Sequence, residues 1–453
     1  MVEELLGPLP VGWKYLTLGD ACSLGSGNIQ TGPFGSQLHA SDYVSSGIPS
    51  IMPQNIGDNR VIESGIARIT QRDAERLARY RVQSGDIIYS RRGDVERRAL
   101  IRERENGWLC GTGCLRVRFG SGFVVPEYAA FYLGHPRVRE WIVRHAHGAT
   151  MPNLNTSILS ACPFVFPSAH EQRLIASILG AFDDKIDLNR RMNETLEAMA
   201  RAIFKDWFVD FGPTRAKMEG REPYLARDIW DLFPNALDAE AKPEGWTRGV
   251  LGDIATSPRT GVQPSEVDPE TPYIGLEHMP RRCIALYDWE GAGKVSSAKC
   301  PFGHGDFLFG KLRPYFHKVG VAAVDGICST DIVVVKPIEH AWRAFTIACI
   351  STDDFVSYTD RTSTGTKMPR TSWTAMASYE LFQPTFGVAR AFDDFCWPLI
   401  EHILSNIQES RTLVQTRDLL LPKLMSGEIH LKAAENAVEN ALCLPVLHDE
   451  GKV

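Results

Sequence analysis

Residues 170–210 read HEQRLIASILGAFDDKIDLNRRMNETLEAMARAIFKDWFVD, and this stretch carries two interleaved apolar series. Each series recurs every seven residues, and the two stand alternately three and four residues apart, which is the pattern of a coiled-coil seam. Both series turn polar at their centre, at Asn189 and Asn193. The predicted seam positions of this helix are Ile175, Leu179, Phe182, Ile186, Asn189, Asn193, Leu196, Ile203 and Trp207.

A second stretch near the C-terminal end repeats this design at a constant offset of 217 residues, as from Leu196 to Leu413. Asn406 occupies the position that Asn189 occupies in the first helix. Because the seams and their polar centres match, we expect the two helices to pair with each other as an antiparallel coiled coil within one chain. The predicted seam positions of this second helix are Phe392, Leu399, Ile403, Asn406, Leu413, Leu420 and Leu424.

The sequence before each helix is also repeated, with an offset that shrinks along the chain. Trp13 corresponds to Trp246 at an offset of 233, Gly85 to Gly305 at 220, and Met151-Pro152 to Met368-Pro369 at 217. A period of this length indicates a duplicated domain rather than a solenoid repeat. The predicted parts are a first domain at 1–168, a long helix at 169–211, a linker at 212–241, a second domain at 242–390, a long helix at 391–430 and a tail at 431–453.

Each domain has the pattern of a mixed α/β fold. Short strands bounded by Gly and Pro are predicted within 48–120 and 271–336. A helix is then expected at 126–144, with a kink near Pro136, and its counterpart is expected at 341–358. The fold class predicted is therefore α/β, with two globular domains joined by two long antiparallel helices and related by a pseudo-twofold axis. At about 1.5 Å per residue, such helices are long enough to hold the two domains apart.

Composition narrows the class of protein. The chain has 453 residues, enough for two or three domains, with 44% hydrophobic and 23% charged residues. No apolar run of about 18 residues occurs, so no membrane span is expected. The acidic start of the sequence lacks the pattern of a signal peptide, and the ten cysteines have no regular spacing. Reduced thiols and a cytoplasmic location are therefore predicted.

The net charge of −6 is unevenly distributed. Residues 1–168 carry 18 Lys and Arg against 15 Asp and Glu, and residues 242–390 carry 16 against 16. The acidic excess lies in 169–241 (10 against 14) and in 391–453 (5 against 10). Because phosphate binding needs a local basic face rather than a basic chain, this distribution permits nucleic-acid binding by the two domains.

Motifs for catalysis are absent from the sequence or incomplete. The run Gly291–Lys294 resembles the end of a phosphate loop but is followed by Val295 instead of Ser or Thr. Cys110 and Cys114 lack the further paired ligands of a structural zinc site. The signature of amino-methyltransferases does not occur. We therefore predict no catalytic residue, no bound cofactor and no metal, with a thiol hydrolase using Cys110 or Cys114 as a distant alternative.

Basic and amide side chains recur at corresponding places in the two domains. One group follows the strand predicted at 86–89, another follows the strand at 306–309, and a third lies in the Gly- and Thr-rich loops around the two Met-Pro pairs. Arginine can bond a guanine edge and asparagine an adenine edge, although a charge run most often only faces water. The candidate DNA-binding residues are Arg91, Arg92, Arg97, Arg98, Asn153, Asn155, Lys311, Arg313, Lys318, Lys367 and Arg370.

Several motifs together resemble the specificity subunit of type I restriction–modification systems. These are the run TGPFGSQL at 31–38, MPNLN at 151–155, EQRLIA at 171–176 and FKDWFVDF at 204–211. The resemblance covers about residues 9–430. The second copy departs from it, because it lacks the GPFGS run and has GVAR at 387–390 where Glu-Gln is expected.

The resemblance implies two target recognition domains, each reading half of a bipartite and asymmetric double-stranded DNA sequence. It also implies two modification subunits that bind S-adenosylmethionine and methylate adenine, and restriction subunits that use ATP and magnesium to translocate and cut. This chain itself is then a non-catalytic subunit. The alternative from another class is a coiled-coil scaffold with two protein-binding modules and no contact with DNA.

Overall fold

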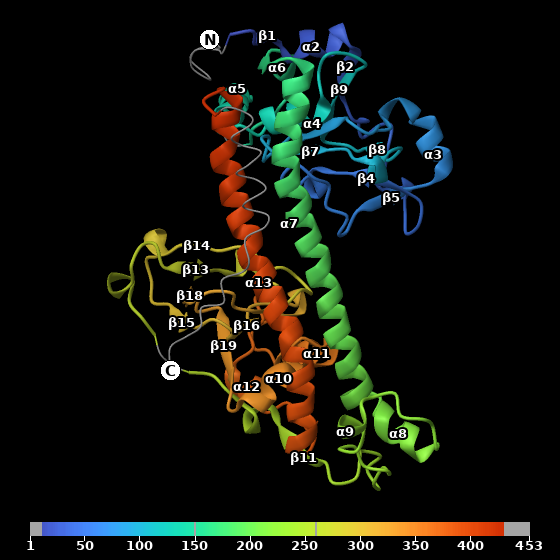
Figure 1. Cartoon of the computed structure of the whole chain (residues 1–453), viewed down its shortest axis with the longest axis vertical. Coiled ribbons are helices and arrows are strands. Elements are labelled where there is room, and N and C mark those ends of the chain that lie inside the picture. The colour runs from blue at the N-terminus through green and yellow to red at the C-terminus, as the bar shows by residue number, and fades with distance from the viewer. Residues whose placement is uncertain (1–10, 149–150, 259–260, 430–453) are drawn as a thin grey trace. The chain divides into compact units, whose positions relative to one another are not determined.

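The computed structural model describes residues 11–148, 151–258 and 261–429, which form two compact units. Within these ranges, unit 1 comprises 11–184 and 413–429, and unit 2 comprises 185–412. The boundary falls inside both long helices, α7 (Ala169–Phe204) and α13 (Phe386–Met425), so each unit holds one sheet-containing domain and part of each helix (Figure 1). The predicted class, α/β with two domains and two long helices, is confirmed. The predicted tail at 431–453 lies outside the described residues.

Unit 1 contains two four-stranded sheets and a two-stranded ribbon. The sheet orders are β2-β9-β6-β7 and β3-β5-β4-β8, and the ribbon pairs β1 with β10. The strands are β1 (Lys14–Thr17), β2 (Ser26–Thr31), β3 (Tyr43–Val44), β4 (Ile48–Ile51), β5 (Ala67–Ile69), β6 (Ile87–Ser90), β7 (Arg98–Leu100), β8 (Leu109–Cys110), β9 (Cys114–Gly120) and β10 (Pro163–Phe166). The helices before α7 are α2 (Leu18–Leu24), α3 (Gln71–Arg76), α4 (Pro126–Tyr132), α5 (Pro136–His145) and α6 (Thr156–Ser160).

Unit 2 has the same plan. Its sheet orders are β12-β19-β16-β17 and β14-β13-β18-β15, and its ribbon pairs β11 with β20. The strands are β11 (Thr247–Val250), β12 (Ala255–Thr256), β13 (Pro272–Ile274), β14 (Glu290–Gly291), β15 (Cys300–Phe302), β16 (Phe307–Gly310), β17 (Val319–Val321), β18 (Gly326–Cys328), β19 (Ile332–Pro337) and β20 (Glu380–Gln383). The helices are α8 (Gly212–Met218), α9 (Arg227–Trp230), α10 (Arg343–Ile350), α11 (Asp353–Arg361) and α12 (Trp373–Ala377).

The registers of the two main sheets correspond residue by residue. In unit 1 Ile87 pairs with Val117, and in unit 2 Phe307 pairs with Val335. The parallel pairs also correspond, because β4 pairs with β8 in unit 1 and β13 pairs with β18 in unit 2. The central strands β6 and β16 are buried along their whole length, as expected of continuous apolar runs. The fold is therefore duplicated, as the repeated sequence predicts.

A repeated Leu-Gly-Asp turn joins the ribbon to the main sheet in each unit. The Leu18 N–H donates to the Cys162 carbonyl at 2.8 Å in unit 1, and the Leu251 N–H donates to the Tyr379 carbonyl at 2.9 Å in unit 2. A Cβ added to Gly19 would lie 2.9 Å from the Cβ of Ser160. The glycine of this turn is therefore required because a short helix passes close to it.

Helix α7 begins with a capping box and ends in a π turn. The Ser168 N–H donates to the Glu171 carboxylate at 3.1 Å, and the Ser168 Oγ accepts from the Glu171 N–H at 3.3 Å. At the other end, Lys205–Val209 form a π turn that closes when the Asp210 N–H donates to the Lys205 carbonyl at 2.8 Å. The regular α-helix thus stops at Phe204, inside the predicted range of 169–211.

Three other element bounds differ from the sequence expectation. Helix α13 begins at Phe386 rather than at 391, because the Thr385 carbonyl already accepts from the Ala389 N–H at 3.0 Å. The helix expected at 126–144 is two helices, since His135 caps a new helix that has Pro136 in its first turn. The helix expected at 341–358 is also split, because the Thr352 side chain caps α11.

The stretch at 212–241, expected as a linker, is folded. It contains α8 and α9, and Trp230 and Phe233 are buried. The ring of Phe233 meets the ring of Trp207 edge-on, with centroids 5.1 Å apart. Apolar side chains within the charged and Pro-containing stretch therefore attach it to the core of unit 2.

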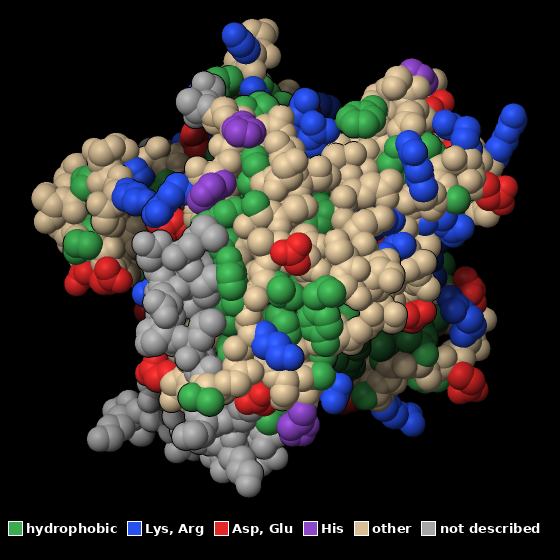
Figure 2. Space-filling model, turned by 90° about the horizontal axis from the view of Figure 1, so that it is seen from above, with side chains coloured by type: hydrophobic (Ala, Val, Ile, Leu, Met, Phe, Trp, Pro, Cys, Tyr) green, Lys and Arg blue, Asp and Glu red, His purple; other side chains and the backbone are tan. Residues whose placement is uncertain are grey.

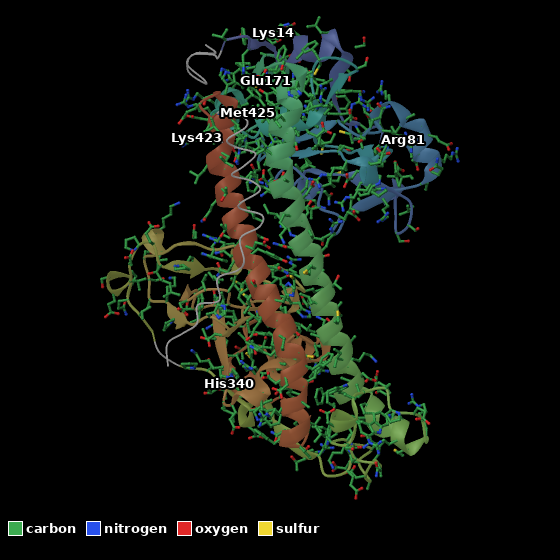
Figure 3. The ribbon with its side chains drawn as sticks, in the orientation of Figure 1. Lys14, Arg81, Glu171, His340, Lys423 and Met425 are labelled. Atoms are coloured by element: carbon green, nitrogen blue, oxygen red, sulfur yellow. The ribbon has the colours of Figure 1, made fainter. Side chains whose placement is uncertain are left out.

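The sixteen predicted seam residues are all buried or half-buried. In unit 2 the two helices run antiparallel, because Asn189 and Asn193 lie beside Ser410 and Asn406 respectively. In unit 1 the start of α7 and the end of α13 are paired, with Asp183 bonded to Arg417. Figure 3 labels Glu171 at the start of α7 and Met425 near the end of α13.

Neither long helix resembles a membrane span. In the part of the chain that the structure describes, no helix combines the length and the apolar character needed to cross a bilayer.

Candidate nucleic-acid interface

Three loops meet at the carboxyl end of the central strand in unit 1. The loop after β6 receives a hydrogen bond from one neighbouring loop and donates to two. The Arg91 N–H donates to the Gly113 carbonyl at 2.8 Å, and the Gly93 N–H donates to the Pro152 carbonyl at 3.1 Å. The Leu154 N–H donates to the Arg91 carbonyl at 2.8 Å. These bonds fix the basic loop after β6 against the Met-Pro loop.

Unit 2 repeats the three bonds at the end of β16. The Lys311 N–H donates to the Asp331 carbonyl at 2.9 Å, and the Arg313 N–H donates to the Pro369 carbonyl at 2.8 Å. The Thr371 N–H donates to the Lys311 carbonyl at 3.0 Å. The two loop assemblies therefore share one backbone framework and differ in side chains. We call them the reading loops: residues 91–93, 111–113, 147–148 and 151–154 in unit 1, and 311–313, 329–331 and 364–371 in unit 2.

The Met-Pro loop of each unit is a short hairpin. In unit 1 His147 and Asn153 exchange backbone bonds of 3.0 and 2.7 Å, and in unit 2 Thr364 and Arg370 exchange two of 3.0 Å. The turn of each hairpin begins at a glycine with positive φ, 102° at Gly148 and 94° at Gly365. Ala149 and Thr150 lie outside the described residues.

Aromatic rings lie beside the basic side chains of both reading loops. In unit 1 the Arg91 guanidinium lies 6.0 Å from the ring centroid of Phe34, which is 54% exposed. In unit 2 the Arg313 guanidinium lies 6.0 Å from the ring centroid of Phe316, and the exposed ring of Tyr315 packs edge-on against Phe316. Cations held over aromatic faces are pre-oriented and stay near the surface. These aromatic residues were not predicted as part of the site, because nothing in their sequence pattern places them beside the basic side chains.

Seven of the eleven candidate DNA-binding residues lie on the reading loops. Lys367, Arg92 and Arg370 are exposed, and Arg370 pairs with Asp331 at 3.1 Å. Figure 2 shows that Lys and Arg side chains are interspersed with Asp and Glu on the face that it presents. The candidates are therefore described by the loops that carry them. These seven residues are Arg91, Arg92, Asn153, Lys311, Arg313, Lys367 and Arg370.

The other four candidates are occupied within the protein. Arg98 is 5% exposed, and its guanidinium donates to the Ala130 carbonyl at 2.6 Å and to Asp58 at 3.3 Å. Asn155 caps α6 by accepting from the Ile158 N–H at 2.8 Å. The remaining two are Arg97, which pairs with Asp94, and Lys318, which donates to the Leu276 carbonyl.

The contacts of Arg98, Asn155 and Lys318 have structural roles, whereas Arg97 is exposed and its ion pair with Asp94 resembles that of Arg370 with Asp331. A side chain that is buried or that caps a helix is not free to bond a base edge. Burial also lowers the pKa of Lys318, since the amine loses its hydration. These contacts could not be predicted from the sequence, because the partners of Arg98 and Lys318 are more than 30 residues away along the chain.

An ionic cluster joins the domain of unit 1 to its two helix segments, with Arg417 and Asp183 largely buried and the Asp58 side chain 55% exposed. Arg417 on α13 bonds Asp183 on α7 at 2.7 Å and Asp58 in the domain at 3.0 Å. The Asn59 amide also donates to Asp183, at 3.1 Å. Burial by itself would raise the pKa of Asp58, but Arg98 and Arg417 outweigh it and lower the pKa. The cluster holds the domain against the helices by charge-assisted bonds.

In unit 2 one carboxylate has the corresponding role. Glu197 on α7 is 6% exposed, and both of its oxygens accept from the Ile284 N–H at 3.1 Å. Arg201 pairs with it from the next helical turn. Burial raises the pKa of Glu197, although Arg201 and the Ile284 N–H act in the opposite direction.

The cysteines and the potential metal ligands of the described residues do not have the surroundings typical of a reactive thiol or a metal site. Cys110 and Cys114 are buried, and burial raises the pKa of Cys110 to about 12, so its thiol stays protonated at neutral pH. Among the described residues, Glu277, His278 and Glu290 form the one group with the spacing of metal ligands. The Nδ1 of His278 already accepts from the Gly275 N–H at 2.9 Å. This exposed group has no buried ligand that would mark a built metal site.

Comparison with known proteins gives consistent matches. The family described as "Type I restriction modification DNA specificity domain" matches residues 10–198. The MjaIX specificity subunit of Methanocaldococcus jannaschii is 23% identical over 442 residues, covering 95% of this chain and 96% of that protein. The HindI specificity subunit of Haemophilus influenzae is 24% identical, covering 84% of this chain and 95% of that protein.

A solved structure has the same fold. The S subunit of a type I restriction–modification system from M. genitalium superposes with a TM-score of 0.52 at 15% identity, covering 91% of this chain and 96% of that one. The likeness thus extends through both domains and both long helices. Along nearly its whole length, the chain is therefore similar to specificity subunits of type I restriction–modification systems.

Proposed function

We propose that this chain recognises double-stranded DNA for a type I restriction–modification complex and is not itself catalytic. The reading loops of unit 1 read one half of a bipartite target, and those of unit 2 read the other. The observation that carries this proposal is the duplicated backbone framework, with Arg91 N–H to Gly113 and Lys311 N–H to Asp331 at equivalent places. A framework built twice, with basic and amide side chains on it, suits the reading of two sites of similar geometry.

The two halves of the target are proposed to differ in sequence. After the Met-Pro pair, unit 1 presents Asn153 and unit 2 presents Arg370. Asparagine pairs best with an adenine edge and arginine with a guanine edge in the major groove. Because the frameworks match and the side chains do not, we expect an asymmetric target.

Catalysis is proposed to belong to partner chains. Two modification subunits would supply adenine methylation from S-adenosylmethionine, and restriction subunits would supply cleavage driven by ATP with magnesium. This chain would then bind none of these cofactors, and it would act in the cytoplasm, where the DNA is. The paired helices α7 and α13 would fix the interval between the half-sites and offer surfaces to the modification subunits.

A gel-shift titration of the chain with its modification subunits tests the proposal. Binding should prefer one sequence over scrambled duplexes and should weaken steeply as salt rises, because phosphate contacts release counterions. The variant Arg92→Ala should weaken binding to all sequences, since Arg92 is exposed on a reading loop. Its matched control is Arg144→Ala, another exposed arginine of unit 1, at the end of α5, which should bind as wild type.

The opposite result would favour the scaffold alternative. A complex that assembles with its partner chains but binds all duplexes equally, or none, would contradict the DNA-reading function.

A further inference from the structure

Met151 and Met368 are exposed apolar side chains at the same place in the two hairpins. Their exposed fractions are 62% and 44%. Each stands three residues after the positive-φ glycine of its turn and directly before a proline. The other residues between the glycine and the proline are Ala or Thr and, in unit 2, Lys. A methionine side chain left in solvent in both copies has no role in the core of either unit.

The backbone that carries each methionine is held in place. The carbonyl of Pro152 accepts from the Gly93 N–H at 3.1 Å, and that of Pro369 accepts from the Arg313 N–H at 2.8 Å. A proline restricts the residue before it to extended conformations. A Cβ added to Gly148 would also lie 2.7 Å from the Met151 carbonyl oxygen, so the turn is tight. The side chain therefore projects from a fixed point on the reading loops.

The surroundings of these methionines are basic and polar. Arg92 lies on the loop that bonds to the first hairpin, and Lys367 and Arg370 flank Met368, all three being exposed. Asp331 offsets one of these charges by pairing with Arg370. Such surroundings complement phosphates better than they complement an apolar pocket on a protein partner.

Proteins that deform DNA insert apolar side chains, methionine among them, between base pairs beside basic phosphate contacts. Methionine suits this role because its unbranched thioether adapts to an irregular gap and contacts aromatic faces favourably. We infer that Met151 and Met368 are wedges, each of which enters the base stack of the half-site read by its own unit and unstacks one step. This inference rests on the proposed function and adds a positioning role to it.

The wedge has a consequence for the target. Pyrimidine–purine steps unstack most easily, so each half-site should contain one such step at the wedge. The methionine would then select an easily unstacked base step, even though no side chain forms a hydrogen bond to a base edge there.

Fluorescence of 2-aminopurine tests the inference in the complex of the full chain with its modification subunits. The probe replaces one base at a time through both half-sites and brightens where stacking is lost. In wild type, one step of each half-site, distinct from the methylated adenine, should brighten on binding. Met151→Ala should abolish the signal in one half-site, and Met368→Ala should abolish it in the other. Met151→Leu and Met368→Leu, which keep an apolar wedge, should retain the signal.

Matched controls come from the same units. Leu24→Ala and Ile338→Ala remove side chains that are 64% and 52% exposed. Leu24 lies just before β2 and Ile338 lies just after β19. The opposite end of each strand leads into loops at the site, so both control residues lie away from it. Both variants should keep the wild-type signals.

Four results would overturn the inference, and they are distinguishable. If wild type selects its target but no step brightens, or if the alanine variants keep both signals, the methionines are not wedges. If the alanine variants instead lose the modification subunits from the complex, the methionines belong to a protein interface. If wild type shows no sequence preference, the proposed function itself fails, and this is seen in the binding step before any fluorescence is read.

Discussion

At the scale of single residues, Glu197 shows how a buried charge can position a domain at a cost in stability. Its two oxygens fix the backbone at Ile284, yet the carboxylate lies almost out of contact with water. Because burial raises its pKa in the folded state, the folded protein binds the proton of Glu197 more tightly than the unfolded chain, where Glu titrates at about 4.3. The ionised carboxylate therefore opposes folding increasingly as the pH rises from about 4 through the folded pKa.

The variant Glu197→Gln should remove this pH-dependent cost. The amide keeps one oxygen for the Ile284 N–H but does not titrate, so the variant should gain stability relative to wild type between about pH 4 and pH 7. Urea unfolding at both pH values measures the difference. Glu194→Gln, an exposed position one turn earlier on α7, is the control and should show no such gain. A difference between Glu197→Gln and wild type that does not change with pH would contradict the assignment.

At the scale of elements, the polar centre of the helix pair is its most specific feature. In unit 2 the Asn406 amide donates to the Asn193 side-chain oxygen at 2.8 Å, and the Asn193 amide donates to the Tyr287 hydroxyl at 3.1 Å. Both asparagines are buried. A buried polar pair in an apolar seam fixes register at the expense of stability.

A double-mutant cycle tests this pairing. Asn406→Leu should cost about 1–3 kcal/mol of unfolding free energy, because it leaves the Asn193 oxygen buried without its donor. Asn193→Leu should cost a similar amount. The double variant, with leucine at both positions, should cost clearly less than the sum, since the unpaired groups are removed together. Strict additivity in urea unfolding would show that the pair is not coupled.

The elements also show what periodicity can and cannot predict. The seam positions were predictable because a seven-residue spacing specifies one helix face, and that face is buried. Trp397, Ile400, Leu404 and Ile407 of α13 are also buried, on a face packed against the domain core, which a seam pattern does not reveal. The helix breaks before Pro136 and at Thr352 are made by the capping residues His135 and Thr352. A helical pattern of apolar residues does not show where a cap interrupts it.

At the scale of the whole molecule, the duplication could be predicted to within a residue, because the offsets of 220, 218 and 217 recur in the hydrogen bonds of the reading loops. The candidate site was predictable only in part. Arg98 and Asn155 resemble surface residues in the sequence, but the structure buries one and uses the other as a cap. Phe34, Met151 and Met368 were not among the predicted site residues. They are exposed beside the reading loops, and this exposure depends on how loops distant in the sequence pack together.

The duplication leads to the central claim, that each unit reads one half of an asymmetric DNA target. The reading loops of the two units have equivalent backbone hydrogen bonds but different side chains. Each unit should therefore recognise its own half-site independently of the other. Replacing residues 1–168 by the matching domain of another specificity subunit should therefore change one half-site and leave the other half-site unchanged.

Genome-wide mapping of methylated adenines, in cells that carry the modification subunits with and without this chain, tests that claim most directly. With the wild-type chain we predict methylation at a single bipartite motif whose two halves differ, and with the exchanged domain at a motif altered in one half only. Methylation that does not depend on the chain, or an exchange that changes both halves or neither, would contradict the account.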